Sequence, residues 1–324
     1  FVPPYILEAV AKSTDVEESR VACQNTLKHT TANAQHRREV CTKAHVQLLS
    51  PTEFARQIYD CQGSDTLPGT LVRSEGETGV KDRQVNNTYE GFGIVRNFFQ
   101  QVFGRNSLDD NGLALLGSES PEGYNNAFWN GNINQMVFGD GDHIAFDYLT
   151  DSLDVIGHEL SHGFVQYSSP LDYYKQSGAL NESCADIFGF MAEQWHTKQT
   201  CDKADWDLGQ TLFPVAFTGS ALRTLKAGKA YTNDPVFGTD PQPKHMDNLY
   251  TGNSDGGGVH INSGSPNHAF YLAAKALGGY SWEKAAKVWY KTMTSGRIPV
   301  DCDFATFAAV AVDVAGAGVR GDGG

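Results

Sequence analysis

The segment DVIGHELSHGFVQY, residues 154–167, carries two histidines four positions apart, His158 and His162, with Glu159 next to the first. Positions four apart on a helix lie on one face about one turn apart, so both imidazoles can reach the same cation. Glu159 projects about 100° around the helix from His158, beside that cation rather than onto it. The alternative is an ordinary amphipathic helix, because a pattern of five residues also arises by chance.

A third candidate ligand lies in the helix-like segment SGALNESCADIFGFMAEQW, residues 177–195, which carries Glu182 and, four residues later, Asp186. Nineteen residues separate His162 from Glu182, enough for the chain to turn and return antiparallel. Asp186 would then accept the free ring N–H of a ligand histidine and fix its tautomer. A solvated helix face is the usual place for acids, but the two segments together predict a zinc site.

The composition is that of a globular protein, with 324 residues of which 40% are apolar and 11% aromatic. No apolar run reaches the roughly 18 residues of a membrane-spanning helix, and no basic region followed by an apolar one opens the chain. We therefore expect a soluble protein. The first residue is Phe1 rather than Met, which we take as a sign of trimming compatible with export.

The formal net charge is −13, which argues against nucleic acid or an anionic membrane as the main partner, since each favours a basic surface. The charge is unevenly distributed. Residues 1–45 hold six basic and five acidic residues, whereas the remainder holds 19 basic and 33 acidic ones. The opening segment is therefore compositionally a different piece of the chain.

The cysteines are even in number, which suits an oxidising compartment, and they allow 15 complete pairings among which the sequence does not choose. They are Cys23, Cys41, Cys61, Cys184, Cys201 and Cys302. A buried thiol is an equally good interpretation of Cys184. Asn86 begins a glycosylation sequon, which matters only if the protein is secreted.

Hydrophobic periodicity predicts a mixed first half and a helical second half. Residues 5–30 are predicted helical, with a capping box of Thr14 and Glu17 starting a second helix there. The other predicted elements are a strand in 69–76, short strands in 124–142, and helices over 85–103, around His158, over 181–196, from Ser265, from Ser281 and over 303–315. This order indicates an α+β protein of two lobes.

Several separate blocks of sequence resemble the thermolysin family of zinc endopeptidases. They are HELSH (158–162), GALNESCADIFG (178–189), NNAFWNG (125–131), GSALRTL (219–225) and DGGGVHINSGSPNHAFYLA (255–273). PPYIL (3–7), LPGTLVRSEG (67–76) and VFGRNSLDDNGLALLG (102–117) are similar to the protealysin-like branch of that family. The Gly-x-Met-Glu-Asn signature of the related zinc aminopeptidases is absent.

The resemblance implies a two-lobe fold with a β-rich N-terminal lobe, a mainly helical C-terminal lobe and the active-site helix at their junction. Residues 1–48 match the short, helical and inhibitory propeptide of the protealysin-like branch. Residues 49–155 then form the N-terminal lobe and residues 156–324 the C-terminal lobe. An N-terminal structural element that never leaves is the alternative for residues 1–48.

For the catalytic site, the resemblance implies one zinc ion held by His158, His162 and Glu182, with Glu159 as general base on a water molecule. Oxyanion stabilisation falls to Tyr173 and His260, the latter oriented by Asp255. Asn181 and Asp186 match the partners that orient the ligand histidines. Taken without the family, His260 in a glycine-rich segment reads more readily as a turn residue.

For substrate binding, the resemblance implies an edge strand that pairs with an extended peptide, at Asn126, Ala127 and Trp129. An apolar pocket takes the residue after the scissile bond, with Phe146, Leu149, Val155, Leu208 and Leu222 as its walls. Arg223 matches the arginine that binds the substrate carbonyl on that side. We therefore expect cleavage before Leu, Phe, Ile or similar residues.

A calcium ion is also expected, because acidic positions that bind calcium in this family recur here. They are Asp154, Glu193, Asp205 and Asp207, which lack an obvious basic partner in the sequence. Gln210 replaces an acid at one further position, so a single calcium ion is expected rather than a pair.

The expected partners are peptide or protein substrates and the chain's own propeptide, for a secreted monomer that binds neither nucleic acid nor membrane. Two other functions stay open at this point: a catalytically silent, protease-like binding protein and a zinc exopeptidase. The presence of Glu159 with all three ligands disfavours the first, and the missing aminopeptidase signature disfavours the second. The physiological substrate and the processing bond are not encoded in any recognisable pattern.

Overall fold

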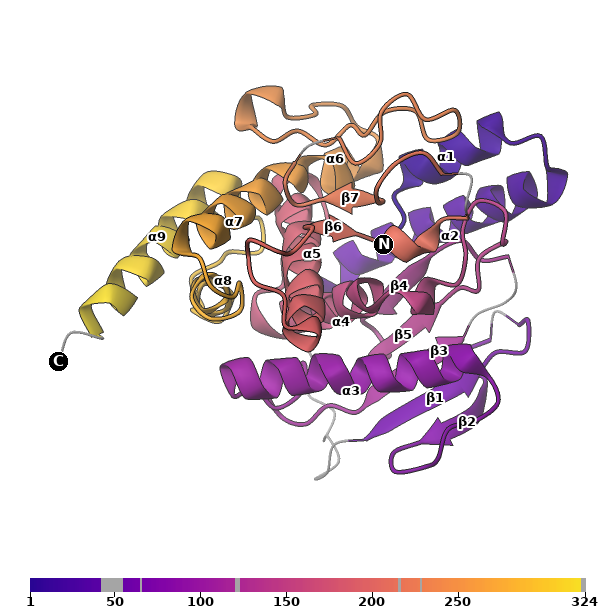
Figure 1. The fold of residues 1–324 in the computed structure, drawn as a ribbon, viewed down its shortest axis with the longest axis horizontal. Helices are drawn as coiled ribbons and strands as arrows, with labels where there is room; N and C mark the ends of the chain where they lie inside the picture. Colours follow the sequence, from indigo (N-terminus) through magenta and orange to yellow (C-terminus); the bar gives the residue numbers. More distant parts are fainter. Residues whose placement is uncertain (42–54, 65, 120–122, 215–216, 228, 322–324) are drawn as a thin grey trace.

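A computed structural model describes residues 1–41, 55–64, 66–119, 123–214, 217–227 and 229–321. Two helices open the chain, and a five-stranded sheet follows with one long helix across it. The rest is mainly helical (Figure 1). The α+β fold with two lobes is confirmed. The end of the expected propeptide, at residue 48, lies outside the described residues.

The N-terminal segment folds as α1 (Pro4–Ser13) and α2 (Glu17–Cys41), which pack on each other. Pro4 begins α1, a position where proline gives up no useful donor. The second helix starts near the expected place and runs well past residue 30. The capping box itself is wrong, because the Thr14 hydroxyl accepts from the amide of Val16 rather than from that of Glu17.

The sheet has the strand order β2-β1-β3-β5-β4, and β4 therefore lies at an edge. The strands are β1 (Arg56–Asp60), β2 (Thr70–Ser74), β3 (Leu115–Glu119), β4 (Ala127–Asn130) and β5 (Gln135–Phe138). β1, β3 and β5 run parallel, while β2 and β4 are antiparallel to their neighbours. Helix α3 (Arg83–Phe103) begins with Asp82 accepting from two backbone amides and ends at Gly104 in the left-handed region.

The helical half is built on α4 (Leu153–Ser168) and α5 (Lys175–Thr197), which lie side by side at the centre of the molecule (Figure 1). A Cβ atom on Gly157 would lie 2.8 Å from the Cα atom of Gly189. A Cβ atom on Gly189 would lie 2.5 Å from the backbone nitrogen of His158. The two glycines thus allow the helix backbones to touch. This close approach sets the distance between the side chains that α4 and α5 present to each other.

The remaining elements complete the second half of the chain. They are the short strands β6 (Asp207–Leu208) and β7 (Arg223–Thr224), the 3₁₀ turns η1 (Leu149–Asp151), η2 (Gln210–Leu212) and η3 (Met246–Asn248), and the helices α6 (Asp255–Asn262), α7 (Gly264–Leu277), α8 (Ala285–Met293) and α9 (Phe304–Gly321). The helix expected from Ser281 begins four residues later. Among the described residues, no helix combines the length and apolarity needed to cross a bilayer.

Candidate metal centre

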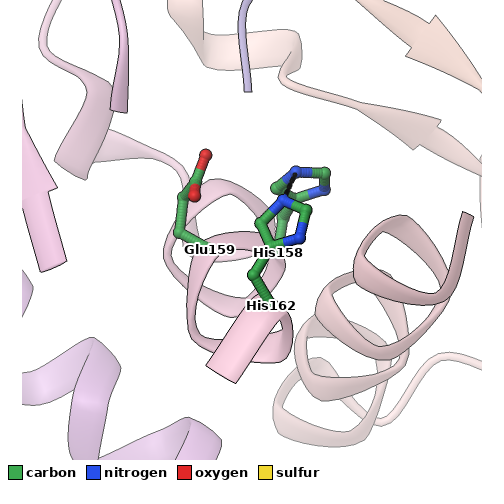
Figure 2. Close-up of side chains that lie close together, drawn as sticks. All are labelled: His158, Glu159 and His162. Carbon is green, nitrogen blue, oxygen red and sulfur yellow. Dashed lines mark hydrogen bonds between the residues drawn. The ribbon is translucent and has the colours of Figure 1, made fainter. Parts of the chain in front are cut away.

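Helix α4 presents His158 and His162 on one face, as the spacing predicted, and Figure 2 shows their rings converging with Glu159 beside them. The Nε2 atoms of the two rings are 3.1 Å apart. From α5, a carboxylate oxygen of Glu182 lies 3.5 Å from His158 Nε2, and its other oxygen lies 3.4 Å from His162 Nε2. Ligands about 2.0–2.1 Å from one zinc ion in a tetrahedron are about 3.3 Å apart, so these three side chains fit it.

The donor chemistry fits zinc as well. His158 donates from Nδ1 to Asp186 at 2.8 Å, and His162 donates from Nδ1 to the amide oxygen of Asn181 at 2.8 Å. Burial and the nearby Arg37 charge lower the pKa of His162 well below its usual value, so its Nε2 carries a lone pair. Within the described chain, Glu182 Oε2 is a buried oxygen with no hydrogen-bond partner. A zinc ion at this place would give that oxygen a partner.

Glu159 also belongs to the group of side chains close enough to share one ion with His158 and His162; their ligand atoms lie within 4.8 Å of one another. Both of its oxygens already accept hydrogen bonds, however: Oε2 from the Trp129 amide at 2.9 Å and Oε1 from the Phe1 nitrogen at 2.8 Å. Glu182, with its oxygens 3.5 and 3.4 Å from the two Nε2 atoms, is therefore the better candidate for a third ligand. Burial raises the pKa of Glu159, but the Phe1 amine and the Arg37 guanidinium outweigh burial and lower that pKa to about 2.

Tyr173 and His260 lie on the other side of the centre. The Tyr173 hydroxyl donates to Glu182 and lies 3.3 Å from His260 Nε2. His260 donates from Nδ1 to Asp255 at 2.6 Å, as expected, and its backbone amide donates to the same carboxylate. Burial and the Glu182 carboxylate raise the pKa of Tyr173 well above its usual value, so the hydroxyl keeps its proton.

Asp186 connects the metal centre to the substrate side. Besides His158, it accepts two bonds from Arg223, at 3.1 and 2.8 Å, and one from Asn267 at 2.9 Å. Burial raises the pKa of Asp186, but the Arg223 charge outweighs it and lowers the pKa. The carboxylate is thus ionised and fully bonded, which fixes the ring of His158. Asn267 is a member of this network that the sequence analysis missed.

The edge strand expected at Asn126, Ala127 and Trp129 is β4, and the N-terminal segment occupies it. Asn126 accepts from the Val2 amide at 2.7 Å and donates to the Val2 carbonyl at 3.0 Å. The Phe1 nitrogen donates to the Ala127 carbonyl at 3.2 Å and to Glu159 at 2.8 Å. The first two residues therefore bind the cleft as an extended peptide would.

The residues expected to line the apolar pocket after the scissile bond are all part of the hydrophobic core. All five of its predicted walls are fully buried in the same cluster as Phe1; they are Phe146, Leu149, Val155, Leu208 and Leu222. The Phe1 ring meets the ring of His158 edge-on at 5.0 Å, and the Arg223 guanidinium lies 4.3 Å from its centre. Arg223 also donates to the Phe1 carbonyl at 2.8 Å.

Arg37 of α2 is a second site residue that the sequence analysis missed. Its Nη1 lies 3.0 Å from His162 Nε2 and 3.5 Å from Glu182, and its Nη2 lies 3.3 Å from Glu159. Burial lowers the pKa of Arg37, but Tyr173, Glu159 and Glu182 outweigh burial and raise it. No motif marks this arginine, because its role depends on how α2 packs over the cleft.

The acidic residues expected to bind calcium are brought near one another only in part. Burial, Asp154 and Asp205 raise the pKa of Glu193 to about 8. Within the described chain, however, these carboxylates do not form a trio with oxygens close enough for one ion. The expectation of no basic partner is wrong for Asp207, which pairs with Lys226 at 3.1 Å. Among the described residues, the histidine–glutamate cluster of α4 is therefore closer to a metal site than the acidic residues are.

Comparison with known proteins matches two family models along the chain. Residues 13–166 match the model described as thermolysin metallopeptidase, catalytic domain, and residues 169–320 match the thermolysin metallopeptidase, alpha-helical domain. An extracellular metalloprotease of Pectobacterium carotovorum is 45% identical, over 95% of this chain and 87% of that protein. Protease PrtS of a Photorhabdus strain is 43% identical, over 96% of this chain and 85% of that protein.

A solved structure resembles the fold closely. It is the precursor of protealysin, a metalloproteinase from Serratia proteamaculans, which is 44% identical in sequence with a TM-score of 0.87. The match covers 97% of this chain and 92% of that one. Because the match covers nearly the whole chain, it includes most of the N-terminal segment that forms α1 and α2.

Proposed function

The chain belongs to the thermolysin family of metallopeptidases, and from that premise we propose how its own side chains perform peptide hydrolysis. It is a zinc endopeptidase, as its family, its relatives and the histidine–glutamate cluster agree. The observation that carries the proposed roles is the convergence of His158, His162 and Glu182 with Glu159 at their side. Neither the binding-protein nor the exopeptidase alternative accounts for it better.

We propose that His158, His162 and Glu182 hold the zinc ion. When bound there, zinc polarises the peptide carbonyl and lowers the pKa of a water molecule. Glu159 is the general base that takes the proton of this water, and the same carboxyl group then protonates the departing amine.

Tyr173 and His260 are the proposed donors to the negative charge that develops on the carbonyl oxygen. Tyr173 keeps its proton at neutral pH and so remains a donor. Asp255 holds the His260 ring with Nε2 toward the centre, where it lies 3.5 Å from Glu182.

The proposed substrate is a peptide with a bulky apolar residue directly after the scissile bond. The support is the Phe1 side chain, which fills the space beside Leu222 and Gly209; a Cβ atom on Gly209 would lie 3.1 Å from the Phe1 ring. Asn126 and Arg223 would bond the substrate backbone as they bond Val2 and Phe1. A peptide series varied at this position should show kcat/KM at least about tenfold higher for Phe or Leu than for Ala.

The N-terminal segment, residues 1–48, is proposed to act as an inhibitory propeptide. Its first two residues fill the cleft, and α2 adds contacts such as Thr26 to the Asn125 amide at 3.0 Å and Ser19 to Asp142 at 2.6 Å. A cavity of about 300 Å³ remains between this segment and the cleft, lined in part by Arg37, Tyr173 and His260. Residues 49–155 and 156–324 are proposed as the two lobes.

A single structural calcium ion is also proposed, at Asp154, Glu193, Asp205 and Asp207. Support is stronger for the first three, because burial together with the charges of Asp154 and Asp205 raises the pKa of Glu193, and a cation would offset that repulsion. The carboxylates must move closer than they are here for calcium to bind. We further propose that the protein is extracellular, since a relative 45% identical is named as an extracellular metalloprotease. We also propose that it is a monomer.

An internally quenched peptide blocked at both ends tests these roles. Cleavage should appear once the N-terminal segment is excised, vanish with a chelator and be lost in Glu159→Ala. Blocked ends separate endopeptidase from exopeptidase activity. If the intact chain cleaves as fast as the excised enzyme, the inhibitory role is wrong; if neither cleaves, the catalytic assignments are wrong.

A further inference from the structure

Arg37 contacts the same atoms that hold the metal. Its guanidinium lies within 3.0 to 3.5 Å of one ligand histidine, one ligand carboxylate and the base: His162, Glu182 and Glu159. The side chain is 15% exposed, and its guanidinium carbon lies over the Tyr173 ring, 5.0 Å from the ring centre. The contact comes from α2, far from the motif in sequence.

The lone pair of His162 decides what this contact means. Nδ1 of this ring donates to Asn181, so Nε2 is its single accepting atom. That lone pair can accept an N–H bond from Arg37, or it can bind zinc at about 2.0–2.1 Å. It cannot serve both at once, because it is the single lone pair of this ring nitrogen and Nη1 already lies 3.0 Å from Nε2.

The charges of the centre lead to the same result. Glu159 and Glu182 bring two carboxylates into a fully buried site, and Arg37 lies 3.3 and 3.5 Å from them. A divalent cation and a guanidinium held at this same place repel each other in a medium that screens charge poorly. Each cation therefore disfavours the other at this place.

We propose that Arg37 and the catalytic zinc ion compete for the ligand atoms of this centre, so that the docked N-terminal segment weakens zinc binding. This inference rests on the proposed role of residues 1–48, and it names one side chain through which the segment acts on the metal. Because coupling between two binding events is reciprocal, zinc must weaken the docking of α2 by the same factor.

The neighbouring arginine provides a matched control. Arg38 lies on the same helix and carries the same charge, but it pairs with Asp172 at 3.5 Å and stacks on Tyr174, with its side chain half exposed. Removing Arg38 changes the charge and the helix as much as removing Arg37 does. Of these two arginines, Arg37 is the one that contacts His162 and Glu182.

The experiment strips the full-length chain of metal and titrates it with Zn²⁺ against a chromophoric chelator, using wild type, Arg37→Ala, Arg37→Lys and Arg38→Ala. Arg37→Ala should lower the zinc Kd by about tenfold or more, since three charge-assisted contacts no longer compete. Arg37→Lys keeps the positive charge but loses the two-pronged guanidinium, so its zinc Kd should lie between those of wild type and Arg37→Ala. The zinc Kd of Arg38→Ala should equal that of wild type. Hydrogen exchange over residues 27–41 should speed up with zinc in wild type and much less in Arg37→Ala.

Equal zinc affinity in Arg37→Ala, Arg38→Ala and wild type would overturn the proposal, and so would weaker binding in Arg37→Ala. If Arg37→Ala does not fold, the Lys variant and the exchange measurement on wild type decide. Blocked-peptide cleavage after excision of the segment is a separate result, so the proposed function can stand while this competition fails.

Discussion

The two sites expected to bind cations share the helices α4 and α5 but differ in how their side chains are held. At one end, His158, His162 and Glu182 converge, and the histidines are fixed by Asp186 and Asn181 at 2.8 Å. Toward the other end, Glu193 faces Asp154 and Asp205, which only repel it. The difference teaches that a binding site depends on the partners that orient its ligands as much as on the ligands.

The largest expected effect comes from breaking the preorganised end. Glu182→Gln should weaken zinc binding by more than about 100-fold, because it removes a charged ligand rather than a supporting partner. Competition with a chelator on the excised enzyme measures this. Glu193→Gln on the same helix is the control and should leave zinc affinity unchanged. An equal loss of zinc affinity in both variants would contradict the claim that Glu182 binds zinc and Glu193 does not.

A smaller effect is expected from the support of a ligand. Asp186→Asn keeps the shape of the side chain but removes the charge that binds His158 and Arg223. Zinc binding should weaken by about 10–100-fold, as for other partners of metal-binding histidines. The same competition assay measures it, and wild-type affinity in this variant would mean that the His158 ring is held by packing alone.

The acidic end should respond to pH in the opposite sense from a paired carboxylate. Glu193 has its pKa raised from 4.5 to about 8 by burial, Asp154 and Asp205, so unfolding releases its proton between those values. Stability contributed by this group therefore falls as the pH rises through that window. In calcium-free buffer at pH 8, Glu193→Gln should raise Tm by about 2–4 °C or more, and at pH 4 the gain should vanish. A variant less stable than wild type at both pH values would contradict this.

The smallest effect concerns the membership of Asp207 in the acidic cluster. Lys226→Ala removes its partner, a half-exposed lysine at 3.1 Å, and should change stability by less than about 1 kcal/mol. If Asp207 is a calcium ligand, the variant should bind calcium more tightly, by calorimetric titration. Unchanged calcium affinity would place Asp207 outside the site.

The sequence predicts the zinc end well because its information is local. Helical spacing places His158 above His162 and Glu182 one turn from Asp186, so only the meeting of two helices remains to be inferred. The strand at 69–76 and the helix over 85–103 also follow from local periodicity and are found within a few residues.

What the sequence does not predict depends on distant packing. Arg37 reaches the centre only because α2 docks across β4, and Asn267 joins Asp186 from α7. Lys226 likewise lies 19 residues after its partner Asp207, and no motif indicates that the two side chains meet. The acidic residues near Glu193 match the family pattern by residue type. The distances between their carboxylates depend on the backbone conformation of the intervening segments, which the pattern does not specify.

Anomalous diffraction at the zinc edge, from crystals of the zinc-loaded protein, tests the central claim most directly. We predict one strong peak bonded to Nε2 of His158, Nε2 of His162 and the carboxylate of Glu182, with Glu159 near it but not bonded. A peak ligated by Glu159 in place of Glu182, or no peak between α4 and α5, would contradict the account.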